Sequence, residues 1–329
     1  MIPLETLKAI KTIVAHDKCP DGIASALILQ HVLPQAKIIF CQYNSPDHEN
    51  MVAEPGMIFA DFSPHRSRIQ EFVDMGAVVL DHHKTAKETV AAFGELGIFG
   101  DESLDPGVSG AVLAWREIWQ RLVFDVHTGD YRPDTDFVMW VGEFARIAGI
   151  RDTWQKQSAD WPTSCVQSSA LFFAPQEELL QAGLYEIWQQ WEDQYEWAGR
   201  ISYNNHKKRV ARAVREGFKH TTPSGTKLLV FQGTKMSSDA AEDPGASESN
   251  IICGFDVIFE AGKVKYLYSC RSRSGYDVSA LAKHYGGGGH KAAAGFNIET
   301  PGSDPYTLFL LIVQDFEALK NAPPEPHGN

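Results

Sequence analysis

Acidic and histidine side chains follow short apolar stretches in the first half of the chain, where strands of a sheet would end. They are His16, Asp21, Asp61, Asp81, His82 and His83. Because ligands bind beyond the carboxyl ends of strands in open parallel sheets, residues this far apart in sequence can converge there. Asp152, which follows an apolar helical stretch, adds a further carboxylate.

This mixture of carboxylates and imidazoles suits a hard to borderline divalent ion such as Mn²⁺, and thiolates are too few for a typical zinc or iron–sulfur cage. Two such ions about 3.5 to 4 Å apart activate a water and stabilise the attacking and leaving oxygens at phosphorus. The residue types therefore indicate phosphoester hydrolysis.

The elements that must position these residues alternate between strand-like and helix-like patterns. Apolar runs at 11–15, 38–41, 57–60 and 77–80 are typical of strands buried on both faces of a parallel sheet. Ser63-Pro64 predicts the start of a helix that ends near Gly76, and residues 85–88 predict a capping box. The pattern predicts an α/β domain, a mostly parallel sheet with helices on both faces.

The second half begins with helices and ends with strands and turns. Residues 108–121, 134–149 and 176–200 are expected to be helical, and strands are expected at 227–231, 257–259 and 264–268, the last two joined around Ala261-Gly262. We predict a domain over 1–175, a helical connector over 176–205, a smaller α+β domain over 206–320 and a disordered tail over 321–329. Residues 235–249 are polar and are expected to form a surface loop.

The composition of the chain limits where the protein is expected to act and which ligands it is expected to bind. Of the 329 residues, 43% are hydrophobic, and no run approaches the roughly 18 apolar residues of a membrane span. The N-terminus lacks the pattern of a signal peptide, and the five scattered cysteines favour reduced thiols, so a cytoplasmic location is expected. The net charge of −12 opposes binding of long nucleic acid but allows a short anionic ligand in a local pocket. A homodimer is left open.

Five motifs in order resemble those of DHH phosphoesterases. The first four are His16…Asp21-Gly22…Ser25, Asp61 within Phe59-Ala60-Asp61-Phe62-Ser63, Asp81-His82-His83, and Asp152. The fifth is similar to the family's associated C-terminal domain: Arg271-Ser272-Arg273, then Asp277 to Ala282, then Gly286 to Phe296 with its run of four glycines and His290. The likeness spans nearly the whole chain.

The resemblance implies a role for each matching residue. Two Mn²⁺ ions, or Mg²⁺ or Co²⁺ as substitutes, would be bound by five ligands: His16, Asp21, Asp61, His82 and Asp152. Asp61 would bridge the two ions. His83 would contact the scissile phosphate or the leaving group, and Asp81 would orient an imidazole. Substrate binding would fall to Arg271, Gly287, Gly288, Gly289 and His290.

One position departs from the family pattern. Many members carry a DxDG motif, whereas this chain has Cys19 in place of the first aspartate. Three alternatives remain: Cys19 is a thiolate ligand, Asp17 reaches the metal instead, or the second ion binds loosely until substrate arrives.

Other residues have simpler explanations beside the functional ones. The glycine run is either a hinge or a phosphate-binding set of backbone N–H groups, and we favour binding. Basic residues from His206 to Lys219 most often form a solvated helix face. Trp188, Trp191 and Tyr195 are expected to pack in a core, and Trp154 is the better candidate for stacking on a base.

The function expected from these observations is a metal-dependent phosphodiesterase that cleaves short oligoribonucleotides or dinucleotides, such as pGpG, to mononucleotides. Two enzymatic alternatives use the same chemistry: a cyclic-dinucleotide phosphodiesterase and a 3′-phosphoadenosine phosphate phosphatase. The alternative from another class is a nucleotide-binding regulatory protein with little turnover, because Cys19 replaces an aspartate.

Overall fold

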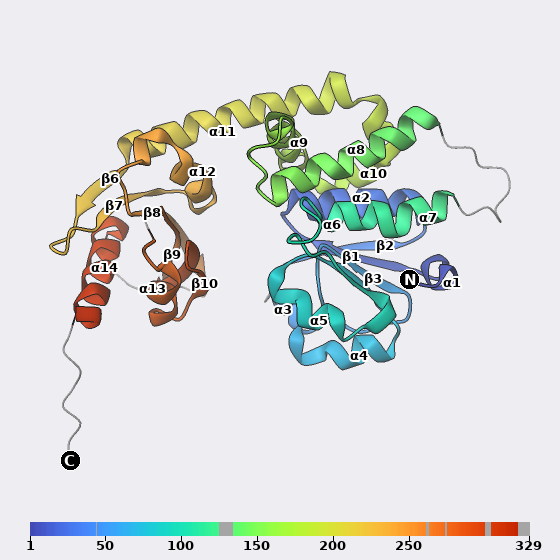
Figure 1. The fold of residues 1–329 in the computed structure, drawn as a ribbon, viewed down its shortest axis with the longest axis horizontal. Coiled ribbons are helices and arrows are strands. Elements are labelled where there is room, and N and C mark those ends of the chain that lie inside the picture. The colour runs from blue at the N-terminus through green and yellow to red at the C-terminus, as the bar shows by residue number, and fades with distance from the viewer. Residues whose placement is uncertain (44, 125–133, 261–262, 274, 300–303, 322–329) are drawn as a thin grey trace, which may run out of the picture. The chain divides into compact units, whose positions relative to one another are not determined.

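The computed structural model describes residues 1–43, 45–124, 134–260, 263–273, 275–299 and 304–321 (Figure 1). The chain divides into two compact units, Met1–Tyr203 and Asn204–Asn329. The predicted turn at Ala261-Gly262 and the predicted disordered tail fall almost wholly outside the described residues.

A five-stranded parallel sheet forms the centre of the first unit, with the strand order β2-β1-β3-β4-β5. Its strands are β1 (Thr12–His16), β2 (Lys37–Cys41), β3 (Met57–Ala60), β4 (Val78–Asp81) and β5 (Gly97–Phe99). The first four were predicted within a residue. The three-residue edge strand β5 was not, because it is too short to show a pattern.

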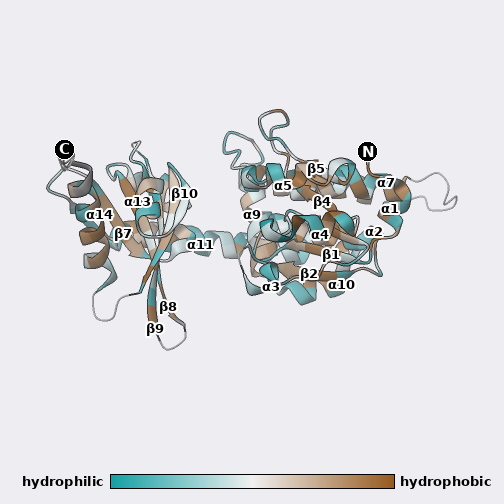
Figure 2. Cartoon of the chain, turned by 90° about the horizontal axis from the view of Figure 1, so that it is seen from below, coloured by the Kyte–Doolittle hydropathy of each residue, from teal (hydrophilic) through white to brown (hydrophobic). Residues whose placement is uncertain are grey.

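Helices cover both faces of this sheet, as predicted. Along β1, Ile13 packs with α2, α6 and α8, whereas its neighbour Val14 packs on the opposite face with α4 and α5. Because successive strand residues point to opposite faces, a strand that is apolar throughout needs cover on both sides. Figure 1 shows α4 and α5 on one side of the strands and α2, α8 and α10 on the other, and strands β1 and β4 are largely brown in Figure 2.

The helices of the first unit are mostly short before residue 134 and longer after it. They are α1 (Leu4–Lys8), α2 (Pro20–Val32), α3 (Pro46–Glu49), α4 (Ile69–Asp74), α5 (Lys87–Ala91), α6 (Gly110–Leu113), α7 (Gln120–Val123), α8 (Thr135–Asp152), α9 (Trp161–Phe173) and α10 (Gln176–Gln189). The predicted connector, 176–205, begins with α10, whose Leu179, Leu184 and Ile187 are buried in the core of this unit.

Two predicted helix starts are wrong. The helix expected from Ser63-Pro64 begins with a 3₁₀ turn at Arg66–Arg68, because the Ser63 hydroxyl donates to Asp81 and does not cap a helix. Thr85 does not begin a capping box, since α5 starts at Lys87 after Ala86, which makes no side-chain cap. A local motif predicts a cap only when no tertiary partner competes for the hydroxyl.

The second unit has a six-stranded sheet with the order β10-β11-β9-β8-β7-β6, antiparallel except between β7 and β8. Its strands are β6 (Phe218–Thr221), β7 (Lys227–Gln232), β8 (Ile251–Glu260), β9 (Lys263–Ser272), β10 (Gly288–His290) and β11 (Ala293–Glu299). Its helices are α12 (Ser237–Glu242), α13 (Val278–His284) and α14 (Pro305–Asn321). Helix α11 (Trp197–Glu216) contains the boundary between the units.

The predicted surface loop at 235–249 is wrong. The segment contains α12 and two 3₁₀ turns, and its side chains Met236, Ala240, Ala241 and Ala246 are buried against one face of the sheet. Small alanines carry this packing, so the polar composition of the segment concealed it. Among the described residues, no helix is long and apolar enough to cross a membrane.

Candidate metal centre

The candidate metal ligands of the first unit lie where three neighbouring strands end. His16 is the last residue of β1, Asp61 directly follows β3, and His82 directly follows β4. Since these strands are parallel and adjacent, their carboxyl ends place the three side chains at one edge of the sheet. This is the convergence that the sequence predicted.

Asp61 lies at the centre of the cluster and is fully buried. Its Oδ1 is 3.1 Å from His82 Nε2, and its Oδ2 is 3.5 Å from His16 Nδ1. Its backbone φ is +57°, a left-handed conformation that is uncommon for residues other than glycine. Such a conformation costs on the order of 1 to 3 kcal/mol and clusters at functional sites, so the surrounding structure must hold it.

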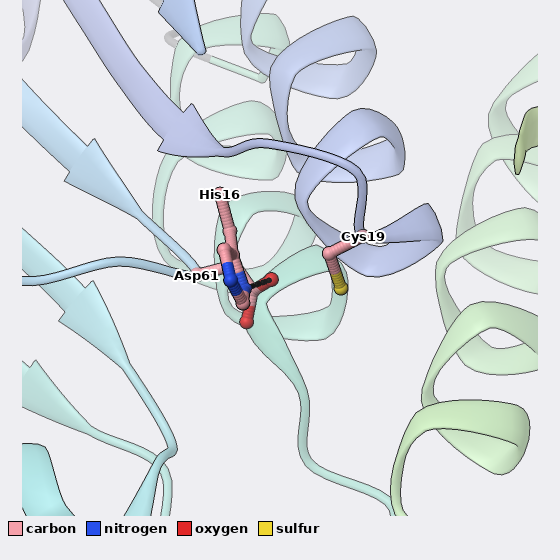
Figure 3. A group of neighbouring side chains, drawn as sticks. All are labelled: His16, Cys19 and Asp61. Carbon is pink, nitrogen blue, oxygen red and sulfur yellow. Dashed lines mark ion pairs between the residues drawn. The ribbon is translucent and has the colours of Figure 1, made fainter. Parts of the chain in front are cut away.

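Two further carboxylates approach His82. Its Nε2 is 3.2 Å from Asp152 Oδ2 at the end of α8 and 3.9 Å from Asp21 Oδ2 in the first turn of α2. Three groups of side chains could each hold an ion, because their ligand atoms all lie within 4.8 Å of one another. The groups are His16, Cys19 and Asp61; Asp61, His82 and His83; and Asp21, His82 and Asp152. Figure 3 shows the first group, with His16 and Asp61 beside each other and the Cys19 sulfur on the same side.

Asp21 is held by residues that the sequence analysis missed. Its Oδ1 accepts from the Ser109 hydroxyl at 2.7 Å, and its Oδ2 accepts from the Gly110 backbone N–H at 2.6 Å. Gly110 also has no room for a side chain, because a Cβ there would lie 2.3 Å from the Cβ of Asp61. The only local signal is Ser109-Gly110 before an apolar run, which by itself predicts no more than a helix cap.

Asp81, for which the resemblance implied a role in orienting an imidazole, is hydrogen-bonded to His83. Its Oδ1 accepts from both the backbone N–H of His83 (2.9 Å) and the imidazole Nδ1 (2.7 Å). Its Oδ2 accepts from the hydroxyls of Ser63 and Tyr43. Tyr43 and Ser63 were not predicted as site residues. With Nδ1 used in this way, the remaining nitrogen of His83, Nε2, is available to a ligand.

The carboxylates of the cluster lie close together, and their charges shift one another's pKa values. Burial and the charges of Asp61 and Asp152 raise the pKa of Asp21, and burial and Asp61 raise the pKa of Asp152. Burial alone would raise the pKa of Asp61 as well, but the imidazoles around it outweigh this effect and lower it. Three negative charges this close favour a cation among them.

The nearby carboxylates also raise the pKa values of two histidines in the cluster. Burial would lower the pKa of His82, but its hydrogen bond to Asp61 and three nearby carboxylates raise it to about 10. For His83, burial is likewise outweighed by Asp81 and Asp61, which raise its pKa to about 9. Without a metal, protons on these rings balance the carboxylates.

The residues fit a divalent metal. Among the described residues, His16 Nδ1 and Asp61 Oδ2 are buried without a hydrogen-bond partner, and both belong to the candidate ligand set. Buried polar atoms are otherwise nearly always satisfied, and these two ligand atoms, 3.5 Å apart, are donors that a cation would satisfy. The mixed nitrogen and oxygen donors suit Mn²⁺.

Of the two replacements considered for the missing first-motif aspartate, Cys19 lies nearer the cluster. Its Sγ is 4.0 Å from Asp152 Oδ1, whereas Asp17 Oδ1 accepts from Gln176 at 3.1 Å and its other oxygen is 3.8 Å from Lys18. Burial and the surrounding carboxylates raise the pKa of the Cys19 thiol well above its usual value. Cys19 would therefore bind as a thiolate only if a metal displaced its proton.

Comparisons with known proteins agree with this geometry. Residues 234–316 match the DHHA1 domain family. The pGpG-specific phosphodiesterase PggH from Vibrio cholerae is 14% identical, with a TM-score of 0.51 over 93% of this chain and 99% of that one. The exonuclease RecJ bound to manganese is 15% identical, with a TM-score of 0.55 over 98% of this chain and 96% of that one. Residues 234–316 therefore form a DHHA1 domain, and the chain shares its fold with these DHH structures.

A further DHH domain, from a protein described as a member of a family of ribosomal proteins, is 12% identical, with a TM-score of 0.58 over 96% of this chain and 88% of that one. A search of curated protein sequences finds no match. The family resemblance read from the five motifs is thus confirmed for the fold and for the DHHA1 domain.

The predicted substrate-binding residues lie in the second unit. Arg271 on β9 is held in place, since its Nε donates to Ser238 Oγ at 3.0 Å and its Nη1 donates to Ser269 Oγ at 3.1 Å. His290 ends β10 and is exposed. Residues 288–290 pair with β11, so part of the predicted glycine loop is an edge strand.

The glycines of this run differ in what they require. A Cβ at Gly287 would lie 2.2 Å from the carbonyl oxygen of Gly295, and one at Gly289, where φ is +136°, would lie 2.5 Å from that of Ala293. Close packing against β11 therefore explains both residues without a ligand. Gly288 faces open space, so it is the better candidate for a backbone contact with substrate.

Proposed function

We propose that the protein is a metal-dependent phosphodiesterase that hydrolyses short oligoribonucleotides or dinucleotides to mononucleotides. The observation that carries the proposal is the position of Asp61, which lies between His16 and His82 with one oxygen facing each ring. A carboxylate in this position can serve two ions, as the bridging role implied by the family resemblance requires.

We propose His16, Asp61, His82, Asp21 and Asp152 as the residues that hold the metal. A bound divalent ion would supply a water of lowered pKa and stabilise charge on the phosphoryl oxygens. Ser109 and Gly110 fix the Asp21 carboxylate, and Asp81 fixes the ring of His83 so that Nε2 can contact a phosphate oxygen. Such supporting contacts preserve the geometry on which catalysis depends.

A second observation supports an anionic substrate. A pocket of about 520 Å³ adjoins His82. Its lining includes Lys84 and Lys87 but also Asp101 and Glu102, and Lys87 is paired with Asp101 at 3.1 Å. Lys84 is exposed and lies two residues after His82. Within a chain of net charge −12, the position of Lys84 beside His82 favours a local phosphate contact over general binding of polyanions.

The proposal also covers the metal, the substrate, the residues that bind the substrate and the cellular location. Manganese is favoured because the donor set suits it and because a related RecJ structure is described as manganese-bound. The dinucleotide pGpG is a reasonable substrate, since a structure of the same fold is described as specific for it. Arg271, Gly288 and His290 would bind the substrate's terminal phosphate or backbone, and the activity would be cytoplasmic.

The deciding experiment is product analysis with Mn²⁺ on labelled dinucleotides to decanucleotides, cyclic dinucleotides and 3′-phosphoadenosine phosphate. We expect mononucleotides chiefly from the shortest linear substrates, with no turnover in chelator or in Asp61→Asn. Cleavage confined to cyclic dinucleotides or to 3′-phosphoadenosine phosphate would replace the proposed substrate with that alternative. Binding without any product would favour a regulatory protein.

A further inference from the structure

Tyr43 lies beside the candidate metal centre but follows a strand that supplies none of its ligands. It comes two residues after β2, and β2 is parallel to β1 and next to it in the sheet. The carboxyl end of β2 is therefore at the same edge of the sheet as His16. The Tyr43 ring makes edge-to-face contacts with two imidazoles, at centroid distances of 5.2 Å to His16 and 5.7 Å to His83.

The hydroxyl of Tyr43 is fixed by one donor and one acceptor. It accepts from the backbone N–H of Ser63 at 3.1 Å and donates to Asp81 Oδ2 at 2.9 Å. Burial and the charge of Asp81 raise the pKa of Tyr43 far above its usual value, so the hydroxyl keeps the proton that it donates. Ser63 is itself held in place, because its carbonyl oxygen lies 2.9 Å from His48 Nε2.

Asp81 connects the Tyr43 hydroxyl to the ring of His83. Its Oδ2 accepts from the hydroxyls of Tyr43 and Ser63, and its Oδ1 accepts from the backbone N–H and the Nδ1 of His83. A carboxylate has about four lone-pair sites, so these contacts use both oxygens fully and oppose rotation of the group. Nδ1 of His83 is 2.7 Å from Asp81 but 3.9 Å from Asp61. Asp81 is therefore the carboxylate that sets the orientation of this ring.

From these contacts we propose that Tyr43 is a positioning residue for the reaction, acting through Asp81 on the ring of His83. The inference rests on the proposed function, in which His83 Nε2 contacts the substrate phosphate. A small displacement of a group that contacts the reacting atoms lowers the rate steeply. Loss of an outer hydrogen-bond partner of this kind typically costs about 10- to 100-fold in activity. Asp81 keeps three donors without the Tyr43 hydroxyl, so the lower end of this range is expected.

The test is a double-mutant cycle on dinucleotide cleavage with Mn²⁺. Tyr43→Phe keeps the ring and removes only the hydroxyl, so kcat should fall about 10-fold while KM and Mn²⁺ content stay unchanged. In a His83→Ala background the same substitution should lower kcat by less than about twofold, because the group that it positions is already gone. A purely structural role would give equal losses in both backgrounds. The matched control is Tyr185→Phe, at a tyrosine of the same unit that is 42% exposed.

A second measurement does not depend on catalysis. The proton on Nδ1 of His83 exchanges with water when its bond to Asp81 opens, and NMR can follow this exchange in the Mg²⁺-loaded protein. The signal is assigned by its loss in His83→Gln. Exchange should be severalfold faster in Tyr43→Phe than in the wild type, because a less restrained carboxylate lets the bond open more often.

Three results would overturn the inference: an unchanged kcat in Tyr43→Phe, an equal loss of kcat in the wild-type and His83→Ala backgrounds, or identical exchange in a folded Tyr43→Phe variant. Failure of the proposed function is distinguishable from these. A wild-type protein that cleaves no dinucleotide, with faster exchange in Tyr43→Phe, would remove the enzyme and keep Tyr43 as the residue that positions His83.

Discussion

The two units present their candidate functional residues in different ways. In the first unit, Asp21, Asp61 and Asp81 are almost fully buried, and each contacts a histidine or is fixed by a hydroxyl or backbone donor. In the second unit, His290 is exposed at an edge strand and Arg271 is bonded to its own sheet and to α12. The first arrangement is a dense, mutually dependent cluster, and the second is a set of separate contacts.

This difference indicates how each region should respond to change. Buried charges that depend on one another are strongly coupled, so removal of one member leaves the others unbalanced. Separate surface contacts contribute more nearly independently. We therefore expect steep, all-or-none losses in the first unit and graded losses in the second. The five experiments below run from the largest expected effect to the smallest.

Asp61→Ala should have the largest effect, because it removes the carboxylate between His16 and His82. Loss of charge stabilisation worth several kcal/mol corresponds to at least about a 1000-fold fall in turnover. Metal content by mass spectrometry should fall in parallel, and EDTA should abolish wild-type activity that Mn²⁺ restores. The control is Asp160→Ala, which removes a half-buried acid of the same unit that is paired with Arg146. Full activity in EDTA would refute the metal centre.

Gly110→Ala should be the next most damaging change, although it alters no ligand. The added Cβ would meet Asp61 and Asp21, so one of the two carboxylates must move. Disturbing groups that orient ligands typically costs 10- to 100-fold in metal affinity or activity, and Ser109→Ala should lie at the lower end. The measurement is Mn²⁺ affinity by calorimetry. Unchanged affinity in a folded Gly110→Ala variant would show that the cluster is more tolerant than we infer.

Arg271→Ala should affect substrate binding and leave the metal centre intact. Loss of about one charge-assisted contact, worth roughly 1.5 to 3 kcal/mol, should lower kcat/KM for dinucleotides about 10- to 100-fold. His290→Ala should act similarly, and both should spare bis-p-nitrophenyl phosphate. Lys263→Ala, an exposed cation on the same strand as Arg271, is the control. If both variants cleave dinucleotides as well as wild type, the DHHA1 domain does not grip the substrate.

Cys19 tests whether the cluster can accept the usual family ligand. Cys19→Asp should raise Mn²⁺ occupancy, because a carboxylate binds the ion without the high pKa that keeps the thiol protonated. Cys19→Ala should lower occupancy if the thiolate is a ligand. Metal stoichiometry of the three proteins is the readout. Identical occupancy throughout would make Cys19 a packed thiol only.

Substitution of His31 should have the smallest effect, and it should change only the stability of the fold. Burial lowers its pKa in the folded state, so below about pH 6.5 the unfolded chain binds more protons and stability is lost as the pH falls. His31→Phe should make unfolding less sensitive to pH between about 7.5 and 5.5. All eight tryptophans lie in the first unit, so their fluorescence follows this unit. An unchanged slope relative to wild type would contradict the effect, and His284→Gln serves as control.

The sequence alone was sufficient for the parallel sheet and for most of the candidate ligands. Apolar runs such as 57–60 predict their strands because a strand buried on both faces leaves a continuous local pattern. Asp61 and His82 are recognisable because each follows such a strand, and strand ends converge in this class of fold. The four motifs and the glycine-rich ending carried the resemblance to DHH phosphoesterases for the same reason: their order is local information.

Only the tertiary structure decided which groups support those residues. Ser109 and Gly110 lie about ninety positions from Asp21, and Tyr43 reaches Asp81 across 38 residues. Nothing in the local sequence of either partner specifies such a contact. Ser63 was mistaken for a helix cap because its partner, Asp81, lies on another strand. The contact of Arg151 with the Trp161 ring and the hydrogen bond from Gln167 to the Phe144 carbonyl likewise depend on packing between helices, which sets such partners only once the core has formed.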